Sequence, residues 1–174
     1  MLEKPLVGVS RCLLGDAVRY DGDSKANTIV IERLGDLFEL LPLCPEVEAG
    51  LSVPRPPVQL TGSIDHPRMT GRNDPGLDVT DRMQAYCNSR PAELDQLSGF
   101  VFKSRSPSCG LYSTPVFIEG ECISETSRGL FARAMTTTFP ELPVIEESEL
   151  EVMDKYKRFI DEVFQYMSSN NTGV

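Results

Sequence analysis

Three of the five cysteines share one sequence context, because each follows a short apolar segment that is typical of a buried strand. They are Cys12 after residues 6–10, Cys44 after residues 38–43, and Cys109 in the loop after residues 100–102. In an open parallel sheet the carboxyl ends of the strands lie at one edge, where ligands bind. We therefore expect three thiols that are distant in the sequence to meet in space.

Three converging thiolates are ligands for a soft metal centre, and the residues leave the type of centre open. An iron–sulfur cluster is held by cysteine thiolates, and three of them on a four-iron cluster leave one iron free to act as a Lewis acid. A structural zinc ion prefers four ligands, and His66, the only histidine, would complete such a set. A cysteine nucleophile normally needs a histidine base beside it, so a single histidine gives that class the weakest support.

The neighbours of two of these cysteines can support a metal centre. Glu46 and Glu48 follow Cys44, and residues 103–110 surround Cys109 with hydroxyl groups and cations. Such groups stabilise an anionic cluster and tune its chemistry. The alternative interpretation of residues 103–110 is a serine-rich turn without a function.

The other two cysteines lack this context. Cys87 falls on the apolar face of a predicted helix, and Cys122 falls in a predicted strand. A free cysteine packs as a small apolar residue, so we predict that both belong to the core.

Composition and charge limit the class of protein. The 174 residues suit one domain, expected to span residues 1–174. A formal net charge of −9 disfavours tight binding of nucleic acid but not of a small substrate. No apolar run approaches the roughly 18 residues of a membrane span, and the N-terminus lacks the pattern of a secretion signal. We therefore expect a cytoplasmic protein with reduced thiols.

The charges are unevenly distributed along the chain. Acidic residues crowd the last third, within residues 146–151, whereas six cations lie in or beside the cysteine segments. These cations are Arg11, Arg19, Lys25, Arg55, Lys103 and Arg105. The pattern predicts either a positive pocket on an acidic body or ordinary scattered surface charge.

Strands that alternate with helices predict an α/β domain with a mainly parallel sheet. The predicted strands are 6–10, 38–43, 100–102 and 142–145. Residues 114–118 and 121–123 are expected to form two further strands, or one strand and a turn. Pro42 predicts an edge position or an early end for its strand. The predicted helices are 24–33, capped by Ser24 and ended by Gly35, then 80–88, 129–137 and 148–167, the last capped by Ser148. Residues 45–76 are predicted to form a long loop with a short hairpin at 58–60.

Five segments, within residues 6–112, resemble the thiouracil desulfurase (TudS-like) family. They are Ser-Arg-Cys-Leu-Leu-Gly at 10–15, Arg-Tyr-Asp-Gly at 19–22, Cys-Pro-Glu-Val-Glu-Ala-Gly-Leu at 44–51, Val-Pro-Arg-Pro-Pro at 53–57 and Lys-Ser-Arg-Ser-Pro-Ser-Cys-Gly at 103–110. The resemblance implies a Rossmann-like three-layer fold and an oxygen-sensitive [4Fe-4S] cluster on Cys12, Cys44 and Cys109. It also implies non-redox hydrolysis of a thione to a carbonyl with release of sulfide, in which Glu46 and either Ser106 or a neighbouring serine of that loop assist.

The same motifs suggest how a substrate is held. Ser104 and Ser108 are candidate ligands of the heterocycle, and Arg11, Arg55 and Arg105 would hold a phosphate if the substrate is a nucleotide. Residues 129–132 and 142–147 look more like the branch of the family in which this domain is fused to a second one. That branch is associated with thiolated uridine compounds, so we expect 2-thiouracil or a thiouridine compound as substrate. The competing hypothesis is a non-enzymatic module that binds a metal or cluster and senses metal or redox state.

Overall fold

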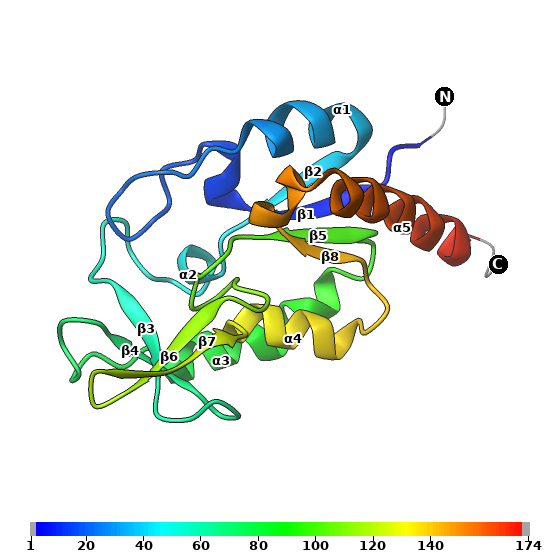
Figure 1. The fold of residues 1–174 in the computed structure, drawn as a ribbon. Helices are drawn as coiled ribbons and strands as arrows, with labels where there is room; N and C mark the ends of the chain where they lie inside the picture. The colour runs from blue at the N-terminus through cyan, green and yellow to red at the C-terminus, as the bar shows by residue number, and fades with distance from the viewer. Residues whose placement is uncertain (1–2, 172–174) are drawn as a thin grey trace.

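The computed structural model describes residues 3–171 and contains two four-stranded sheets (Figure 1). Sheet A has the strand order β2-β1-β5-β8, and every neighbouring pair in it is parallel. Its strands are β1 (Leu6–Ser10), β2 (Glu39–Leu43), β5 (Gly99–Phe102) and β8 (Val144–Glu146). The predicted α/β fold with a mainly parallel sheet is therefore confirmed.

The position of each strand in sheet A explains its sequence. The central strands β1 and β5 are covered on both faces, which is why they read as continuous apolar runs. β2 is an edge strand, as Pro42 predicts, and its middle residues are half-buried or exposed. Proline is tolerated there because an edge strand can lack one backbone donor.

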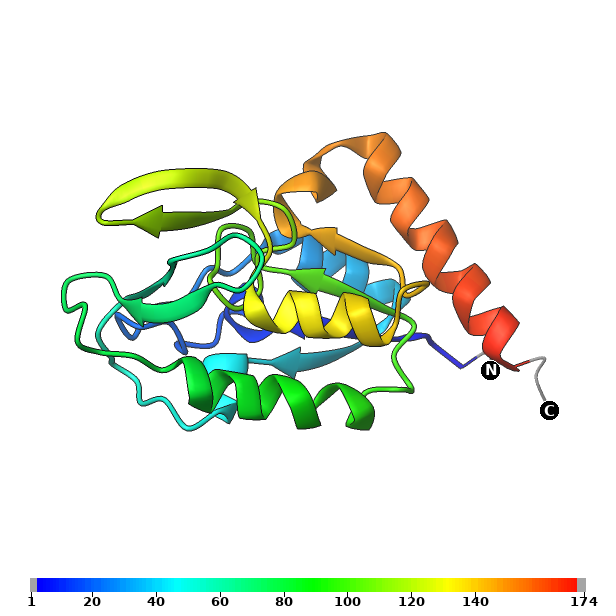
Figure 2. The same cartoon turned by 90° about the horizontal axis from the view of Figure 1, so that it is seen from below.

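Helices cover both faces of sheet A and give three layers (Figures 1 and 2). On one face lie η2 (Ile29–Leu34), α1 (Gly35–Leu37) and α5 (Met153–Asn171). On the other face lie α3 (Thr80–Ser89), α4 (Leu130–Thr138) and the short turn η3 (Pro91–Glu93). Figure 2 shows α3 and α4 lying in front of the sheet.

Because side chains alternate along a strand, each face of sheet A builds its own core. Val9 of β1 packs with Phe38 on the face covered by α5. Phe100 and Phe102 of β5 point to the other face, where both rings meet Phe131 of α4. The two cores hold the sheet between its helices and fix the edge at which the strands end.

A second sheet lies beyond the carboxyl ends of the sheet A strands (Figure 1). Its order is β4-β3-β6-β7, from β3 (Val58–Thr61), β4 (Arg68–Gly71), β6 (Thr114–Ile118) and β7 (Glu121–Ser127). β3 pairs with β6 in parallel, and the other pairs are antiparallel. The predicted hairpin at 58–60 is confirmed by the antiparallel pair β3–β4. The rest of the predicted long loop over residues 45–76 is wrong in part, because it contains the helix α2 (Pro45–Glu48) and its hairpin is half of this second sheet.

Two predicted helix boundaries are also wrong. Ser24 does not cap a helix, because residues 24–27 run alongside the turn η1 (Arg11–Leu14), where the Lys25 backbone N–H donates to the Cys12 carbonyl at 2.9 Å. The helix begins at Ile29, and the Asn27 side chain accepts the Val30 N–H at 3.1 Å. Gly35 has helical dihedral angles and continues the helix into α1.

The C-terminal helix also begins later than the sequence predicts. Ser148 lies inside the short helix η4 (Glu147–Glu151), which Glu146 caps through a reciprocal capping box with Glu149. An extended residue, Val152, then separates η4 from α5. Among residues 3–171, no helix is both long enough and apolar enough to cross a membrane.

The packing of β1 against β5 leads to a stability prediction. A methyl group at Gly8 would lie 2.5 Å from two ring carbons of Phe100, whose ring is itself stacked on Phe102. We expect Gly8→Ala to lower the free energy of unfolding by about 1–3 kcal/mol. Urea unfolding of the metal-free protein measures this change.

Gly35→Ala is the matched control, since a methyl group there meets its nearest neighbour only at 3.9 Å and the backbone is helical. It should raise the free energy of unfolding by about 0.5–1 kcal/mol. Equal losses at both positions would contradict this account of the β1–β5 packing.

Candidate active site

The strand order of sheet A creates a crevice at its carboxyl edge. The chain passes from β1 to β2 on one side, and β5 then pairs with β1 on the other side. Ligands of open α/β sheets bind where the order reverses in this way. A cavity of about 760 Å³ lies at this point, and residues of β3 and β6 in the second sheet close its far side. Its size is within the usual range for sites that bind small molecules.

Cys12, Cys44 and Cys109 all line this cavity. Cys12 lies in η1 directly after β1, Cys44 precedes α2 directly after β2, and Cys109 lies in the loop after β5. Each thiol therefore follows a strand that is hydrogen-bonded to β1 or is β1 itself. The parallel sheet brings together the three residues that the sequence singles out.

Cys109 is buried and Cys12 and Cys44 are partly buried, and this affects what the three thiols can bind. Burial raises the pKa of Cys12 to about 11, with Lys103 opposing the shift, and burial also raises the pKa of Cys44. Cys109 is enclosed more completely, and burial raises its pKa well above the usual value. Repulsion adds to this effect, since the Cys44 thiolate raises the pKa of Cys12 and both of these thiolates raise the pKa of Cys109. Three thiolates can share this cavity only with cations between them, which is what a metal centre supplies.

The cavity differs from a site for a single metal ion. Within the part of the chain that the structure describes, no three His, Cys, Asp or Glu side chains are arranged around one ion. His66 does not join the cysteines, since it lines a separate cavity of about 590 Å³ beside α3 and α4. This rules out the zinc site completed by His66. In a cluster each thiolate ligates a different iron, so the donor set of three thiolates spread around one cavity fits a cluster.

Cys44 is fixed by a carboxylate of its own helix. Glu48 accepts the backbone N–H of Cys44 at 3.0 Å with one oxygen and Arg90 Nε at 3.1 Å with the other. Arg90 follows the last turn of α3, so this ion pair ties the short helix α2 to a long one. Cys44 therefore has little freedom to move relative to the helical layer.

Glu46 is a buried carboxylate in the cavity wall. It accepts a hydrogen bond from the Ser108 hydroxyl at 2.9 Å through Oε1. Its Oε2 accepts two hydrogen bonds from Arg55, at 2.9 Å from Nε and 2.6 Å from Nη2. The side chains of Arg55 and Glu46 are 7% and 11% exposed, so this is a buried ion pair.

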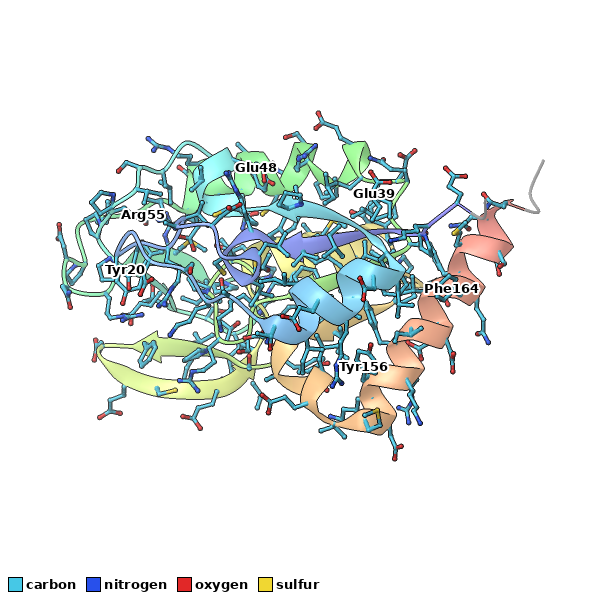
Figure 3. All side chains as sticks on the ribbon, turned by 90° about the horizontal axis from the view of Figure 1, so that it is seen from above. Tyr20, Glu39, Glu48, Arg55, Tyr156 and Phe164 are labelled. Atoms are coloured by element: carbon cyan, nitrogen blue, oxygen red, sulfur yellow. The ribbon has the colours of Figure 1, made fainter. Side chains whose placement is uncertain are left out.

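Arg55 also holds the loops around Glu46. Its Nη1 donates to the backbone carbonyls of Val18 and Ser52, each at 3.1 Å, and its backbone N–H donates to the Tyr20 carbonyl at 2.8 Å. Four of the five guanidinium donors are therefore used within the protein. Figure 3 shows Arg55 and Tyr20 at the same end of the molecule.

Ser106 organises the loop that carries Cys109. Its hydroxyl oxygen accepts the backbone N–H groups of Ser108 at 3.2 Å and Cys109 at 3.0 Å. Its carbonyl oxygen accepts Gly110 N–H at 2.8 Å and the Thr114 hydroxyl at 2.9 Å. The hydroxyl hydrogen of Ser106 is not used in these contacts, so it can be donated into the cavity.

The remaining predicted site residues also line the cavity, in different environments. The Ser104 hydroxyl donates to Glu147 at 2.8 Å, and Arg11 pairs with Asp16 at 2.8 Å with both side chains nearly half exposed. Within residues 3–171 the Arg105 guanidinium makes no hydrogen bond or ion pair, although it is part of the cavity wall.

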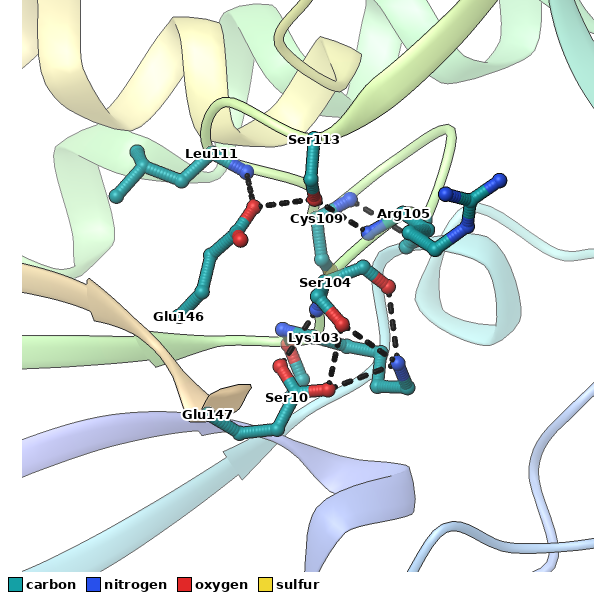
Figure 4. Close-up of polar contacts among 10 residues, drawn as sticks. Ser10, Lys103, Ser104, Arg105, Cys109, Leu111, Ser113, Glu146 and Glu147 are labelled. Carbon is teal, nitrogen blue, oxygen red and sulfur yellow. Dashed lines mark hydrogen bonds and ion pairs between the residues drawn. The ribbon is translucent and has the colours of Figure 1, made fainter. Parts of the chain in front are cut away.

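Sequence reasoning missed two site residues and misplaced one cysteine. Glu146 and Glu147 belong to the acidic segment 146–151 and are not among the predicted site residues, yet both are buried and hold the Cys109 loop (Figure 4). The sequence offers a pattern that could have indicated them, because they directly follow the predicted strand 142–145, as the cysteines follow theirs. Cys87 is buried, as predicted. Cys122 is exposed, because β7 is an edge strand of the second sheet with most of its residues in solvent.

Comparisons with known proteins show which proteins this chain resembles. A solved structure described as the [4Fe-4S]-dependent thiouracil desulfidase TudS (DUF523Vcz) superposes with a TM-score of 0.66 at 29% identity, covering 86% of this chain and 94% of that one. The uncharacterised protein YbbK of Bacillus subtilis (strain 168) is 32% identical over 111 residues, which are 60% of this chain and 73% of YbbK. The 2-thiouracil desulfurase family model matches residues 7–170. With a match over nearly its whole length and a thiol-lined cavity at the expected sheet edge, this chain belongs to the 2-thiouracil desulfurase family.

Proposed function

We propose that this chain is a [4Fe-4S]-dependent desulfurase that hydrolyses the C=S bond of a thiolated nucleobase. The substrate would be 2-thiouracil or a thiouridine compound, and the products the oxo base and sulfide. The observation that carries the proposal is the convergence of Cys12, Cys44 and Cys109 on one cavity with Glu46 and Ser106. Membership of the family supports it, and the reduced thiols that it requires favour the cytoplasm.

Cys12, Cys44 and Cys109 would hold the cluster through their thiolates. With three protein ligands, the cluster when bound supplies an open iron position that can act as a Lewis acid on the thione sulfur. Lys103 contributes a cation on the Cys12 side of the cavity, and the backbone amides of Val47 and Glu46 face the Cys44 sulfur. These groups offset the negative charge of the three thiolates.

Glu46 is the proposed general base. A carboxylate has about four lone-pair positions, and Glu46 uses two on Oε2 for Arg55 and one on Oε1 for Ser108. One position on Oε1 has no hydrogen-bond donor among residues 3–171 and would accept from a water molecule in the cavity. Because Arg55 and Ser108 fix both oxygens, this position has one direction and needs no reorientation during the reaction.

Ser106 is the proposed donor to the substrate. Two backbone N–H groups point at its oxygen, which orients the hydroxyl hydrogen away from the loop and polarises the O–H bond. A donor that is fixed in this way stabilises negative charge that develops on the heterocycle. Ser104 and Ser108 support the site indirectly, since their hydroxyl groups donate to Glu147 and Glu46.

The balance of the reaction is simple hydrolysis. Water adds to the thione carbon and gives one proton to Glu46. The second water proton passes from the resulting hydroxyl group to the sulfur, so the carbonyl forms as the C–S bond breaks and sulfur leaves as hydrosulfide, with no net transfer of electrons. Glu46 then releases its proton, so the net change is thione plus water to carbonyl plus hydrogen sulfide. A single carboxylate with one open lone pair is sufficient for this proton transfer.

The cavity wall also carries cations that suit a nucleotide. The Arg105 guanidinium is available there, and the guanidinium groups of Arg19 and Arg72 lie 5.7 and 5.9 Å from the centre of the Tyr20 ring. In a nucleotide substrate Arg105, with Arg11 at the rim, would hold the phosphate. Arg55 would contribute through Glu46, because most of its own donors are used.

Replacing a proposed cluster ligand should remove both the cofactor and the activity. Cys109→Ser substitutes a hydroxyl group that binds iron poorly, so we expect loss of iron, of visible absorption and of turnover. Anaerobic purification, iron and sulfide analysis, and loss of thione absorbance from 2-thiouracil and 4-thiouridine measure these effects. Cys122→Ser is the matched control and should keep all three, because Cys122 is exposed outside the cavity.

Two outcomes would overturn the proposal. Full iron content in Cys109→Ser would remove this cysteine from the ligand set. A wild-type protein that carries a cluster but removes sulfur from no thiolated base would be the non-enzymatic cluster-binding module instead.

Replacing the proposed base should separate the cluster from turnover. Glu46→Gln keeps the shape of the side chain but cannot accept a proton, so we expect about 10²- to 10⁴-fold slower turnover with unchanged iron content and colour. Glu32→Gln, on the exposed face of η2, is the control and should turn over normally. Full activity in Glu46→Gln would show that another group moves the proton.

Breaking the ion pair should cost stability as well as activity. Arg55→Met keeps the apolar stem but leaves the buried Glu46 charge unpaired, which we expect to lower the free energy of unfolding by about 3–5 kcal/mol. Arg68→Met breaks the exposed pair with Asp78 and should cost far less, because water screens that pair. Denaturant unfolding of both metal-free variants tests this, and similar losses would show that Glu46 is not held as described.

A further inference from the structure

The loop of residues 103–113, called here the cysteine loop, carries every candidate group that follows β5. Ser106, Ser108 and Cys109 all lie on it. A loop with so many backbone N–H groups outside regular structure needs acceptors to hold it in one conformation. Two consecutive residues at the end of the neighbouring strand, Glu146 and Glu147, supply them (Figure 4).

Glu147 holds the first end of the cysteine loop. Its Oε2 accepts the Ser104 backbone N–H at 2.6 Å, and its Oε1 accepts the Ser104 hydroxyl and Lys103 Nζ, each at 2.8 Å. The Lys103 backbone N–H donates in turn to the hydroxyl oxygen of Ser10, at the end of β1, at 2.9 Å. The loop therefore leaves β5 tied to both neighbouring strands.

Glu146 holds the other end of the cysteine loop. Its Oε1 accepts the backbone N–H groups of Leu111 at 2.8 Å and Tyr112 at 3.1 Å, and the Ser113 hydroxyl at 2.6 Å. The carboxylate is almost fully buried. Hydrogen bonds to a charged acceptor are stronger than neutral ones, so this end is anchored firmly.

Two hydrogen bonds through Ser113 connect Glu146 to Arg105, whose backbone is in the left-handed region. Arg105 has a φ of 62°, which is unfavourable for a residue with a Cβ atom. Its backbone N–H donates at 2.7 Å to the Ser113 hydroxyl, which donates to Glu146. The carboxylate thus helps to hold the conformation from which the Arg105 side chain reaches the cavity wall (Figure 4).

Two neighbouring glutamates can serve opposite ends because side chains alternate along extended backbone. Glu146 is the last residue of β8, and Glu147 is the first of η4. The capping box between Glu146 and Glu149 fixes the backbone at this junction. The backbone that carries the two anchoring carboxylates is therefore held in one conformation.

We propose that Glu146 and Glu147 are positioning residues that together fix both ends of the cysteine loop and so hold Cys109 and Ser106 against the cavity. Neither glutamate ligates the cofactor or contacts the reacting atoms in this assignment. Their effect on turnover rests on the proposed function, but their effect on the loop does not. A test on the metal-free chain therefore separates the two.

The chain contains an internal reference for this test. Cys109 and Cys87 are both buried thiols, but Cys87 lies on α3, away from the cysteine loop. Opening of the loop alone would expose Cys109, whereas global unfolding would expose both. Alkylation by iodoacetamide, followed by peptide mass spectrometry, measures the rate at each cysteine in the same sample.

Glu147→Gln is the decisive variant. An amide nitrogen cannot accept the Ser104 N–H, and an uncharged side chain cannot pair with Lys103. In the full-length metal-free protein at fixed pH, we expect the alkylation rate of Cys109 to rise about tenfold or more and that of Cys87 to stay within about twofold. Glu151→Gln removes the same charge from an exposed position of η4 and should change neither rate.

A second variant covers the case in which Glu147→Gln does not fold. Ser113→Ala removes only the hydroxyl group between Arg105 and Glu146, and it should raise the Cys109 rate selectively by about threefold. In reconstituted protein, both variants should also lose iron to a chelator faster than Glu151→Gln does.

An unchanged Cys109 rate in the variants, or an equal rise at Cys87, would overturn the assignment. A selective rise at Cys109 in a protein that desulfurates no thiolated base would keep the positioning role and refute the proposed function instead.

Discussion

The parallel alignment of β2, β1, β5 and β8 is the constraint on which the site depends. Because all four strands run in one direction, the residues that follow them gather at one edge of sheet A. The first three strands are followed by the three cysteines, whereas the fourth ends at one buried glutamate, Glu146, and is followed by another, Glu147. A single antiparallel strand in this sheet would send its following residue to the opposite edge, and the cavity would lose that group.

Buried charge at this edge is compensated by partners from distant segments. Glu46 pairs with Arg55 and Ser108, Glu147 pairs with Lys103, and Glu146 collects three donors from the end of the cysteine loop. An unpaired charge at such depth would be strongly unfavourable. The same contacts that make these carboxylates tolerable also fix the loops, so burial and positioning have one physical cause.

The second sheet gives the site its enclosure. Strands β3 and β6 close the side of the cavity that faces away from sheet A. Without them the carboxyl edge would be an open crevice, in which water would screen every charge–charge contact. The prolines of residues 45–76 suggested a loop, but several of them lie between the short elements and leave β3 and β4 free to pair.

The sequence by itself determined the α/β class, the strand ends that carry Cys12, Cys44 and Cys109, and the edge position of Pro42, because these follow from local runs of apolar residues and from the covalent limits of proline. Only the tertiary structure decided which carboxylates are buried, that His66 lies away from the thiols, and that Cys122 is in solvent. It also decided where two helices begin. The first begins only at Ile29 because the preceding residues bond to η1, and the last begins only at Met153 because Glu146 caps the separate helix η4. Burial and pairing depend on segments far apart in the chain, and no local pattern records which of them will meet.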